Sequence, residues 1–489
     1  MLRPTLEEAE RIAASGNYRV IPISMEMYAD VVTPVEVLKI LKNEDDHCFM
    51  LESAEDCKGW GRYTFLGFDP IMEITCSDGV VNIRTDNTET IETNDPDRYI
   101  RKILKDHKSP RFEYLPPFTG GLVGYFSYDY VKYKEPALNL KAKDSDGFND
   151  VDLMLFDKVI AFDHYRQKIV LIVNVRSDNI KEGYSKGISE LNRMLNLILE
   201  GRPLITPTTR LKSKFKPLFT EEEFCAAVDK AKEQIRNGDI FQVVLSNRLE
   251  ADFEGSLLDA YRKLRTTNPS PYMFYMGGHD IEVAGASPET LLKLQDGKLY
   301  TFPLAGTRPR GNTKEEDLAL EKNLLSDEKE LAEHNMLVDL GRNDLAKISK
   351  IGSVAVDNYL SVLRFSHVMH IGSTVSGNIL EDKDGVDAVN AVLPAGTLSG
   401  APKMRAMQII DELENNKRGI YGGAIGYLDL TGNVDTCIAI RIAYKKNGKV
   451  FIRAGAGIVA DSVPEKEYQE CVNKMKAVRN AIEWSDGGN

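Results

Sequence analysis

The sequence contains no hydrophobic run long enough to cross a membrane and no apolar leader behind its first residues. Its 489 residues include only 6 cysteines, none of them in a Cys-x-x-Cys pair, which argues against a disulfide scaffold or a zinc ribbon. It also lacks a phosphate-binding Gly-x-x-x-x-Gly-Lys-Ser/Thr loop and a nucleophile-elbow serine. We therefore expect a cytoplasmic protein with reduced thiols and no membrane partner.

Basic residues are in the minority. The chain has 62 Lys and Arg against 74 Asp and Glu, which gives a formal net charge of -12. A nucleic-acid partner is not expected, because such proteins need basic surface to neutralise phosphates. An anionic small molecule remains possible, since a local pocket can be positive in an acidic protein. A hydrophobic content of 42% and the length are those of a globular protein with two or more domains.

Two Glu-x-x-Glu pairs are the most informative feature of the chain, Glu330 with Glu333 and Glu467 with Glu470. Each pair falls in a predicted helix, where a spacing of three puts both carboxylates on one face. Neighbouring like charges repel unless a cation offsets them, and an all-oxygen set of four carboxylates suits Mg²⁺. Taken singly, each pair is more often solvated helix surface. The metal hypothesis therefore depends on the residues around the pairs.

Glycine-rich turns and isolated cations accompany the two pairs. The Gly455-Ala456-Gly457 run offers unobstructed backbone amides, and Thr397 precedes a predicted helix start; both suit an anion. Lys474 shares one helix face with the second glutamate pair. Arg441 stands on the small-residue face of a predicted strand, where a ligand partner and a rim salt bridge are equally good interpretations. Together these features indicate a metal-assisted site for a small polyanion.

Apolar periodicity predicts a mixed α+β structure. Helices are expected at four places in the second half: 220–236, 314–340, 402–415 and 464–482. The first has Thr220 as its N-cap, and Ser462 with Glu465 forms a capping-box pattern before the last. Between the last two helices, a meander of three strands is expected: 426–430, 436–444 and 449–454.

Prolines interleave with basic residues over 201–218, which is typical of a linker. We therefore expect an N-terminal α+β region over 1–205 and a second domain over 219–489. The second contains both glutamate pairs and the glycine-rich turns.

Several longer motifs resemble those of the chorismate-utilising enzymes and occur in the same order. They lie at 303–311, 330–344, 394–403, 421–426, 435–441 and 454–459, with shorter ones at 51–53, 61–63 and 120–125. Long motifs in a shared order are far more specific than a lone short match. Within this group the chain most resembles the anthranilate synthase component I family. The resemblance implies an α+β fold in which antiparallel β-sheets pack as a sandwich and are covered by helices, with a regulatory contribution from the N-terminal region.

The resemblance also implies a reaction. That family uses Mg²⁺ and ammonia to convert chorismate to anthranilate and pyruvate, the first step of tryptophan biosynthesis. By resemblance, Glu333 and Glu470 would bind the Mg²⁺ directly, and Glu330 and Glu467 would support it through water. The other implied roles are the enolpyruvyl carboxylate site (Tyr421, Arg441 and the amides of Gly455, Ala456 and Gly457), the substrate pocket (Gly306, Thr307 and Lys474), and assistance in losing the ring hydroxyl and pyruvate (His370, Thr397 and Glu289).

Two positions distinguish members of the group. Where 4-amino-4-deoxychorismate synthases commonly have a nucleophilic lysine, this chain has Ala305, and where isochorismate synthases have a basic lysine it has Gln242. Neither residue can supply the missing group, which favours ammonia as the nucleophile and amination ortho to the carboxylate.

Partners follow from the same resemblance. The 489 residues leave no region for a glutaminase domain, which implies a separate glutaminase subunit and a hetero-oligomer. The resemblance further implies inhibition by tryptophan, in an allosteric pocket formed by two triplets: Leu51, Glu52 and Ser53, and Pro271, Tyr272 and Met273. Plain interdomain packing is the other interpretation of these triplets.

Alternatives remain open. A 2-amino-2-deoxyisochorismate synthase, which keeps the pyruvyl group, is hardly distinguishable by sequence, and a 4-amino-4-deoxychorismate synthase component I is a further possibility. A di-iron carboxylate protein would have Glu-x-x-His pairs on an all-helical bundle, unlike this chain. A non-catalytic effector-binding subunit would tolerate the loss of Glu333 and Glu470.

Overall fold

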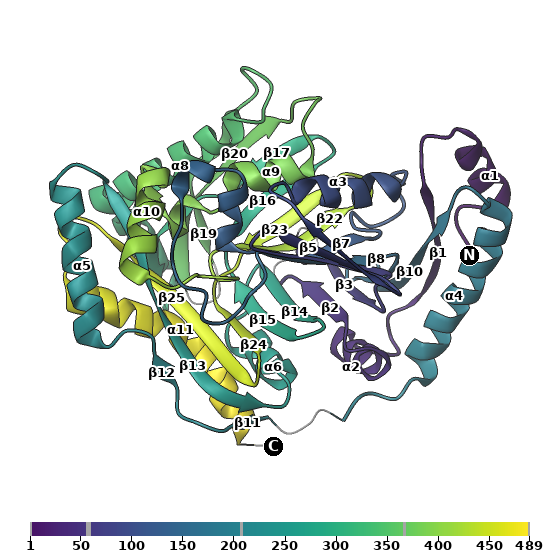
Figure 1. The fold of residues 1–489 in the computed structure, drawn as a ribbon, viewed down its shortest axis with the longest axis horizontal. Helices are drawn as coiled ribbons and strands as arrows, with labels where there is room; N and C mark the ends of the chain where they lie inside the picture. Colours follow the sequence, from purple (N-terminus) through teal and green to yellow (C-terminus); the bar gives the residue numbers. More distant parts are fainter. Residues whose placement is uncertain (1, 55–59, 206–208, 365–367, 488–489) are drawn as a thin grey trace.

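The computed structural model describes residues 2–54, 60–205, 209–364 and 368–487. Its fold is α+β, with two large antiparallel sheets flanked by helices, which confirms the expected fold class (Figure 1). An aromatic core joins the inner faces of the sheets: Phe49 and Phe65 from one pack in the same cluster as Tyr125 and Tyr427 from the other. Burying both inner faces in this way is what makes a sandwich stable.

The first sheet has 13 strands and draws them from both halves of the chain. Its order is β1 (Val20–Tyr28), β10 (Lys168–Arg176), β9 (Lys158–Asp163), β3 (Tyr63–Phe68), β2 (Cys48–Glu52), β14 (Tyr272–Gly277), β15 (Ile281–Ser287), β24 (Ile442–Lys446), β25 (Lys449–Ile458), β13 (Gln242–Glu254) and β11 (Arg210–Leu211), with β12 (Lys216–Pro217) and β21 (Gly400–Ala401) also on β13. The antiparallel β2–β14 pair is where the two halves join, with Leu51 opposite Phe274.

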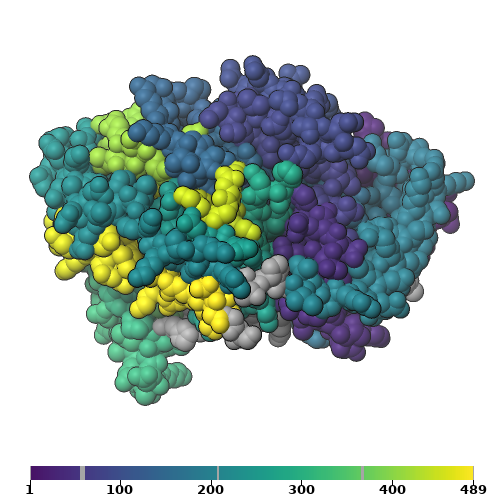
Figure 2. Space-filling model, turned by 60° about the horizontal axis from the view of Figure 1, so that its bottom comes forward, coloured from purple at the N-terminus to yellow at the C-terminus, as the bar shows by residue number. Residues whose placement is uncertain are grey.

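The second sheet has 12 strands and is also shared between the halves. Its order is β18 (Leu304–Pro309), β20 (Val368–Asn378), β17 (Lys298–Thr301), β16 (Thr290–Gln295), β23 (Val434–Ile438), β22 (Ala424–Asp429), β7 (Gly121–Phe126), β8 (Val151–Phe156), β4 (Met72–Ser77), β5 (Val80–Arg84) and β6 (Thr88–Glu92), with β19 (Ala355–Arg364) on β20. In the space-filling view, purple and blue N-terminal segments fill the right of the molecule, and teal segments lie between them and the yellow C-terminal ones (Figure 2).

Helices cover the outer faces of both sheets. The α-helices are α1 (Leu6–Ala14), α2 (Pro34–Glu44), α3 (Asp97–Asp106), α4 (Ile180–Glu200), α5 (Glu221–Arg236), α6 (Leu258–Thr267), α7 (Lys314–Leu325), α8 (Glu328–Ala346), α9 (Gly385–Val392), α10 (Lys403–Glu414) and α11 (Pro464–Asp486), and short 3₁₀ turns lie at Trp60–Arg62, Tyr128–Tyr133, Pro136–Leu138 and Gly396–Leu398. Helices α10 and α11 pack on β13 and β25, whereas α8 packs on β18 and β20. In the described part of the chain, none of the helices is both long and apolar enough to span a membrane.

Helix ends show where capping patterns succeed and fail. Thr220 caps α5 through a complete capping box with Glu223, which confirms that N-cap. The single helix expected over 314–340 is wrong: it divides into α7 and α8, because the Asp327 side chain accepts hydrogen bonds from the first amides of α8. The Ser462–Glu465 capping box is also wrong, since the Ser462 hydroxyl instead accepts from the Val459 amide and Val463 occupies the N-cap.

The prediction of one continuous strand over 436–444 is wrong. This segment divides into β23 and β24, which belong to different sheets. Between them Arg441 adopts a left-handed backbone with φ 55°, an unusual conformation for a side chain of its size. The chain therefore crosses from one sheet to the other at Arg441.

The predicted linker over 201–218 carries two short strands, β11 and β12, which both pair with β13. The residues 206–208 within it lie outside the described part of the chain.

Candidate active site

One cavity of about 580 Å³ is lined by nearly all the catalytic, substrate and metal residues expected from the sequence. It lies where β13 and β25 of one sheet approach β18 and β20 of the other, with α8 and α11 along its sides. Its lining includes these predicted residues: Glu289, Gly306, Thr307, Glu330, Glu333, His370, Thr397, Tyr421, Arg441, Gly455, Gly457, Glu467, Glu470 and Lys474. The exception is Ala456, whose side chain is fully buried in the core beneath the helices, so only its backbone can serve the site.

The two glutamate pairs approach each other from α8 and α11. Burial raises the pKa of Glu333, and the charges of Glu330 and Glu470 raise it further. Burial likewise raises the pKa of Glu467, with Glu470 adding to the effect. The carboxylates of the two helices are thus close enough to interact electrostatically, as a shared cation site requires.

This donor set fits a hard cation in its chemistry, since it consists of carboxylate oxygens facing a polar cavity. The four carboxylates are not arranged around one common position. Among the residues that the structure describes, no three His, Cys, Asp or Glu side chains are placed to hold an ion together. Internal cations take two of the four carboxylates instead. Lys474 lies 2.6 Å from Glu470, and Arg308 lies 3.3 Å from Glu330.

The cavity wall also offers cations and glycine backbone. Arg441 reaches it from the crossing between the sheets, and its Nη1 donates to the Lys474 carbonyl at 3.0 Å. Lys474 Nζ donates in turn to the Gly455 carbonyl at 2.9 Å. Burial lowers the pKa of Arg441, opposed by Tyr421 and Glu470, so its charge would be stabilised by an anionic ligand.

Both glycines of β25 are needed for space. A Cβ on Gly455 would lie 2.9 Å from the Tyr421 hydroxyl, and one on Gly457 would lie 2.7 Å from Nε2 of Gln242. Side chains here would push Tyr421 and Gln242 out of the cavity wall.

Proton-carrying groups lie in two places along the wall. His370 Nδ1 is 2.9 Å from the Gly306 carbonyl and 3.1 Å from the Thr307 hydroxyl. Burial lowers the His370 pKa, which favours the neutral ring. Burial raises the pKa of Glu289 to about 7, and the Thr397 hydroxyl, which donates to it, opposes this shift.

Some residues that line the cavity were not predicted from the sequence as site residues. Lys329, Arg453 and Ser462 also face the cavity. Arg453 had a usable signal, because it stands two residues before Gly455 in one strand and so shares its face. The nearby His334 is fully buried and bonds the Ser373 hydroxyl at 2.7 Å, away from the cavity.

A second cavity of about 400 Å³ lies at the β2–β14 junction. It is lined by both predicted triplets: Leu51, Glu52 and Ser53, and Pro271, Tyr272 and Met273. Glu52 is held there by Arg265 and by the Tyr261 hydroxyl, both at 2.5 Å, and Tyr272 donates to Asp435 at 2.7 Å. The two triplets thus meet in one cavity.

Comparison with known proteins supplies the class. Residues 46–480 match the model of the chorismate binding enzyme family. Because this match covers most of the chain, the protein belongs to the family of chorismate-binding enzymes, as its motifs predicted.

Full-length relatives narrow the resemblance. The chain is 47% identical to anthranilate synthase component 1 of Acetivibrio thermocellus and 45% identical to that of Aquifex aeolicus, over 99% of both chains in each case. Among solved structures, anthranilate synthase component I from Streptococcus pneumoniae TIGR4 has a TM-score of 0.76 and 38% identity, covering 92% of this chain and 98% of that one. The menaquinone-specific isochorismate synthase from Escherichia coli shares the fold, with a TM-score of 0.70 at 20% identity over 98% of each chain.

Proposed function

We propose that this enzyme converts chorismate and ammonia to anthranilate and pyruvate, the first step of tryptophan biosynthesis. The relatives named anthranilate synthase component 1 support the reaction. The observation that carries it is that one cavity of 580 Å³ is lined both by the four carboxylates and by the cations Arg441 and Lys474. A dicarboxylate substrate fits this lining, with one carboxylate approaching the glutamates through a cation and the other approaching Arg441.

The four carboxylates would hold Mg²⁺. Glu333 and Glu470 would contact it directly, and Glu330 and Glu467 would act through water. When bound, this ion supplies a counter-charge for the ring carboxylate and Lewis acidity toward the departing ring hydroxyl. Glu470, which contacts Lys474 at 2.6 Å, would supply a carboxylate to the ion, and the Lys474 ammonium would remain beside the substrate.

The remaining residues bind the substrate and move protons. Arg441, the Tyr421 hydroxyl and the amides from Gly455 to Gly457 would hold the enolpyruvyl carboxylate, since they supply donors in a buried setting. Gly306 and Thr307 would line the substrate pocket, as Lys474 does on the other side. Glu289, with a pKa of about 7, and His370 would carry protons as the hydroxyl and pyruvate leave, with Thr397 holding Glu289 in place.

The proposed nucleophile is ammonia, because the two positions at which other members of the group have a nucleophilic or basic lysine hold no lysine here. Ala305 and Gln242 both line the cavity, and neither has a nucleophilic or basic nitrogen. The ammonia would come from a separate glutaminase subunit, so that the working enzyme is a hetero-oligomer. We also propose that it works in the cytoplasm.

The 400 Å³ cavity would bind tryptophan as a feedback inhibitor. Its position across the β2–β14 pair supports this role, because β14 and β15 lead from that junction to Pro288 and Glu289 in the active-site wall. A ligand that favours one arrangement of this junction would alter chorismate affinity.

The test is an anthranilate fluorescence assay with purified chain, chorismate, MgCl₂ and an ammonium salt. Fluorescence should grow only when all four are present, and excess EDTA should stop it. If the fluorescence increases equally with and without EDTA, the metal assignment is wrong. If no fluorescence appears, the proposed reaction is wrong.

A further inference from the structure

At the wall of the active-site cavity lies a buried cluster of three charges, Glu414, Arg418 and Arg453. Their side chains are 2%, 1% and 0% exposed. Glu414 is the last residue of α10, and Arg418 lies four residues further along the chain. Arg453 lies on β25. We call these residues the Glu414 triad.

One carboxylate serves both guanidinium groups. Arg418 donates to Glu414 through Nε at 3.0 Å and Nη2 at 2.5 Å, and Arg453 donates through Nη2 at 2.7 Å. The other contacts of Glu414 are the amide and hydroxyl of Ser246, at 2.8 and 2.9 Å. These arginines keep the pKa of Glu414 low against the opposing effect of burial, so the triad has one negative and two positive charges.

The remaining donors of the two arginines meet neutral oxygens. Arg418 bonds the Leu398 and Val244 carbonyls, at 2.6 and 2.7 Å. Arg453 bonds the Ser246 hydroxyl at 2.8 Å and the Asn416 side chain at 2.9 Å. The triad therefore carries a net charge of about +1 in a place where water does not screen it, a costly arrangement unless anions lie near. One such anion is Asp146, which pairs with Arg248 and is also attracted by the charge of Arg453.

The active-site cavity is the place from which an anion can approach. Arg453 forms part of its wall, and the Tyr421 ring lies against both arginines, 5.8 Å from Arg418 and 6.0 Å from Arg453. Arg418 also lies 4.6 Å over the ring of Tyr128. The Tyr421 hydroxyl points toward Gly455, where the proposed carboxylate site begins.

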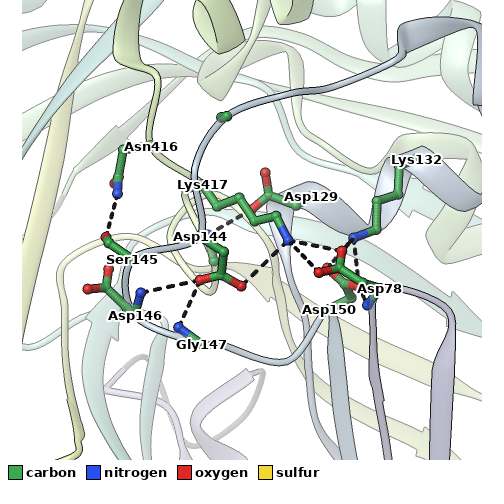
Figure 3. Close-up of polar contacts among 12 residues, drawn as sticks. Asp78, Asp129, Lys132, Asp144, Ser145, Asp146, Gly147, Asp150, Asn416 and Lys417 are labelled. Carbon is green, nitrogen blue, oxygen red and sulfur yellow. Dashed lines mark hydrogen bonds and ion pairs between the residues drawn. The ribbon is translucent and has the colours of Figure 1, made fainter.

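The outer end of the triad is anchored to the N-terminal half. Asn416, which accepts from Arg453, donates to the Ser145 hydroxyl at 2.9 Å, and Lys417 bridges Asp78 and Asp144 at 3.0 and 3.5 Å (Figure 3). Arg453 also donates to the Lys417 carbonyl at 3.2 Å. These contacts hold the arginines in one orientation, which a preorganised electrostatic site needs.

We propose that the Glu414 triad is a positioning unit for substrate binding, whose net positive charge holds Tyr421 in place and attracts the carboxylate that Arg441 binds. This inference rests on the proposed function, because it assumes a substrate carboxylate at Arg441. Arg453 acts through Tyr421 and through its field, without touching the substrate.

Steady-state kinetics of three variants test the proposal. Arg453→Met removes the surplus charge, and the KM for chorismate should rise roughly 10- to 30-fold, as expected for a unit charge about 8–12 Å from its partner at an effective dielectric of about 20. The kcat should change by less than about 3-fold. Arg453→Lys keeps the charge and should leave KM within about 3-fold of wild type. Glu414→Gln raises the triad charge and should leave KM equal or lower.

A double-mutant cycle and a matched control separate this role from simple stability. The KM effects of Arg453→Met and Tyr421→Phe should be less than additive, because both act on one contact. The control is Arg248→Met on β13, another buried arginine paired with Asp146 and Glu250 but outside the cavity wall. It should lower the melting temperature and leave KM unchanged.

Several outcomes would overturn the proposal. An unchanged KM in Arg453→Met, or a rise of tenfold in Glu414→Gln, would show that the charge does not attract the substrate. If Arg453→Met does not fold, the Arg453→Lys and Glu414→Gln pair decides by the same KM criteria. If the wild-type protein turns over no chorismate, both the proposed function and this inference are wrong. If the wild type is active but the variants have the same KM as the wild type, only the inference is wrong.

Discussion

Inside the active-site cavity, the hydroxyl of Thr397 donates a 3.0 Å hydrogen bond to the carboxylate of Glu289. This contact favours the ionised carboxylate, while burial, the larger effect, favours the neutral acid and sets the pKa at about 7. Glu289 therefore gains or loses its proton near neutral pH. A group tuned in this way suits proton transfer and makes folding stability depend on pH.

Glu289→Gln should stabilise the fold at alkaline pH. The folded pKa of about 7 lies above the ordinary 4.5, so the stability that Glu289 contributes is complete below pH 4.5 and is lost as pH rises through 7. Glutamine removes this loss, and the free energy of unfolding should exceed that of wild type by about 1–3 kcal/mol at pH 8.5 and by little at pH 5. Urea unfolding at both pH values measures it, with the exposed Glu412→Gln as control. An equal difference at both pH values would contradict the assignment.

Glu333→Gln and Glu470→Gln should each lower turnover at least ~100-fold and weaken Mg²⁺ binding, while the fold survives. Each change removes one charge from a set in which Glu470 helps to raise the pKa of both Glu333 and Glu467, so folding itself should not suffer. Circular dichroism, titration calorimetry with Mg²⁺ and the fluorescence assay are the measurements. Glu483→Gln, on the same helix as Glu470, serves as the control and should behave as wild type. Normal activity in either site variant would end the metal assignment.

The isolated chain should use ammonium salts and not glutamine. Its rate at a fixed total ammonium concentration should rise with pH, because free ammonia becomes more abundant. Adding a glutaminase subunit should enable the use of glutamine. The checks are anthranilate production with each nitrogen source and the dependence of its rate on free ammonia. Glutamine-dependent product from the purified chain alone would refute the need for a partner.

Tryptophan should raise the apparent KM for chorismate, and Ser53→Phe should relieve this effect with little change in uninhibited turnover. Ser53 lines the 400 Å³ cavity, where a phenyl ring would occupy the space proposed for the indole. Chorismate saturation curves with and without tryptophan, for both proteins, are the measurement. A wild type insensitive to tryptophan, or a variant that remains fully sensitive, would show that this cavity is not the regulatory site.

The sequence indicated which residues gather in one cavity better than it indicated the strands. Glu330 with Glu333 and Glu467 with Glu470 could be recognised because helical spacing is local, and the folded chain brings both pairs to one cavity. The change of sheet at Arg441 left no such signal, since its left-handed backbone stands in an otherwise ordinary run of strand residues. What made Arg441 suspect was its isolation among small and apolar neighbours.

The Glu414 triad and the long sheets could not be predicted for a related reason. Arg453 meets Glu414 across 39 residues of chain, and β2 pairs with β14 across more than two hundred. Such contacts depend on the whole topology, and single-sequence periodicity carries no information about them. The division of α7 from α8 is different, because Asp327 is a good N-cap whose effect could have been anticipated within the run of apolar residues.

The central claim is that this cavity aminates chorismate and then releases pyruvate. The most direct measurement is the product balance with chorismate, MgCl₂ and ¹⁵N-ammonium, which follows anthranilate and pyruvate in one time course. The account predicts ¹⁵N-labelled anthranilate and pyruvate in equal amounts, and neither after EDTA treatment. An aminated product that keeps its pyruvyl group, an amine para to the carboxylate, or isochorismate without nitrogen would contradict it.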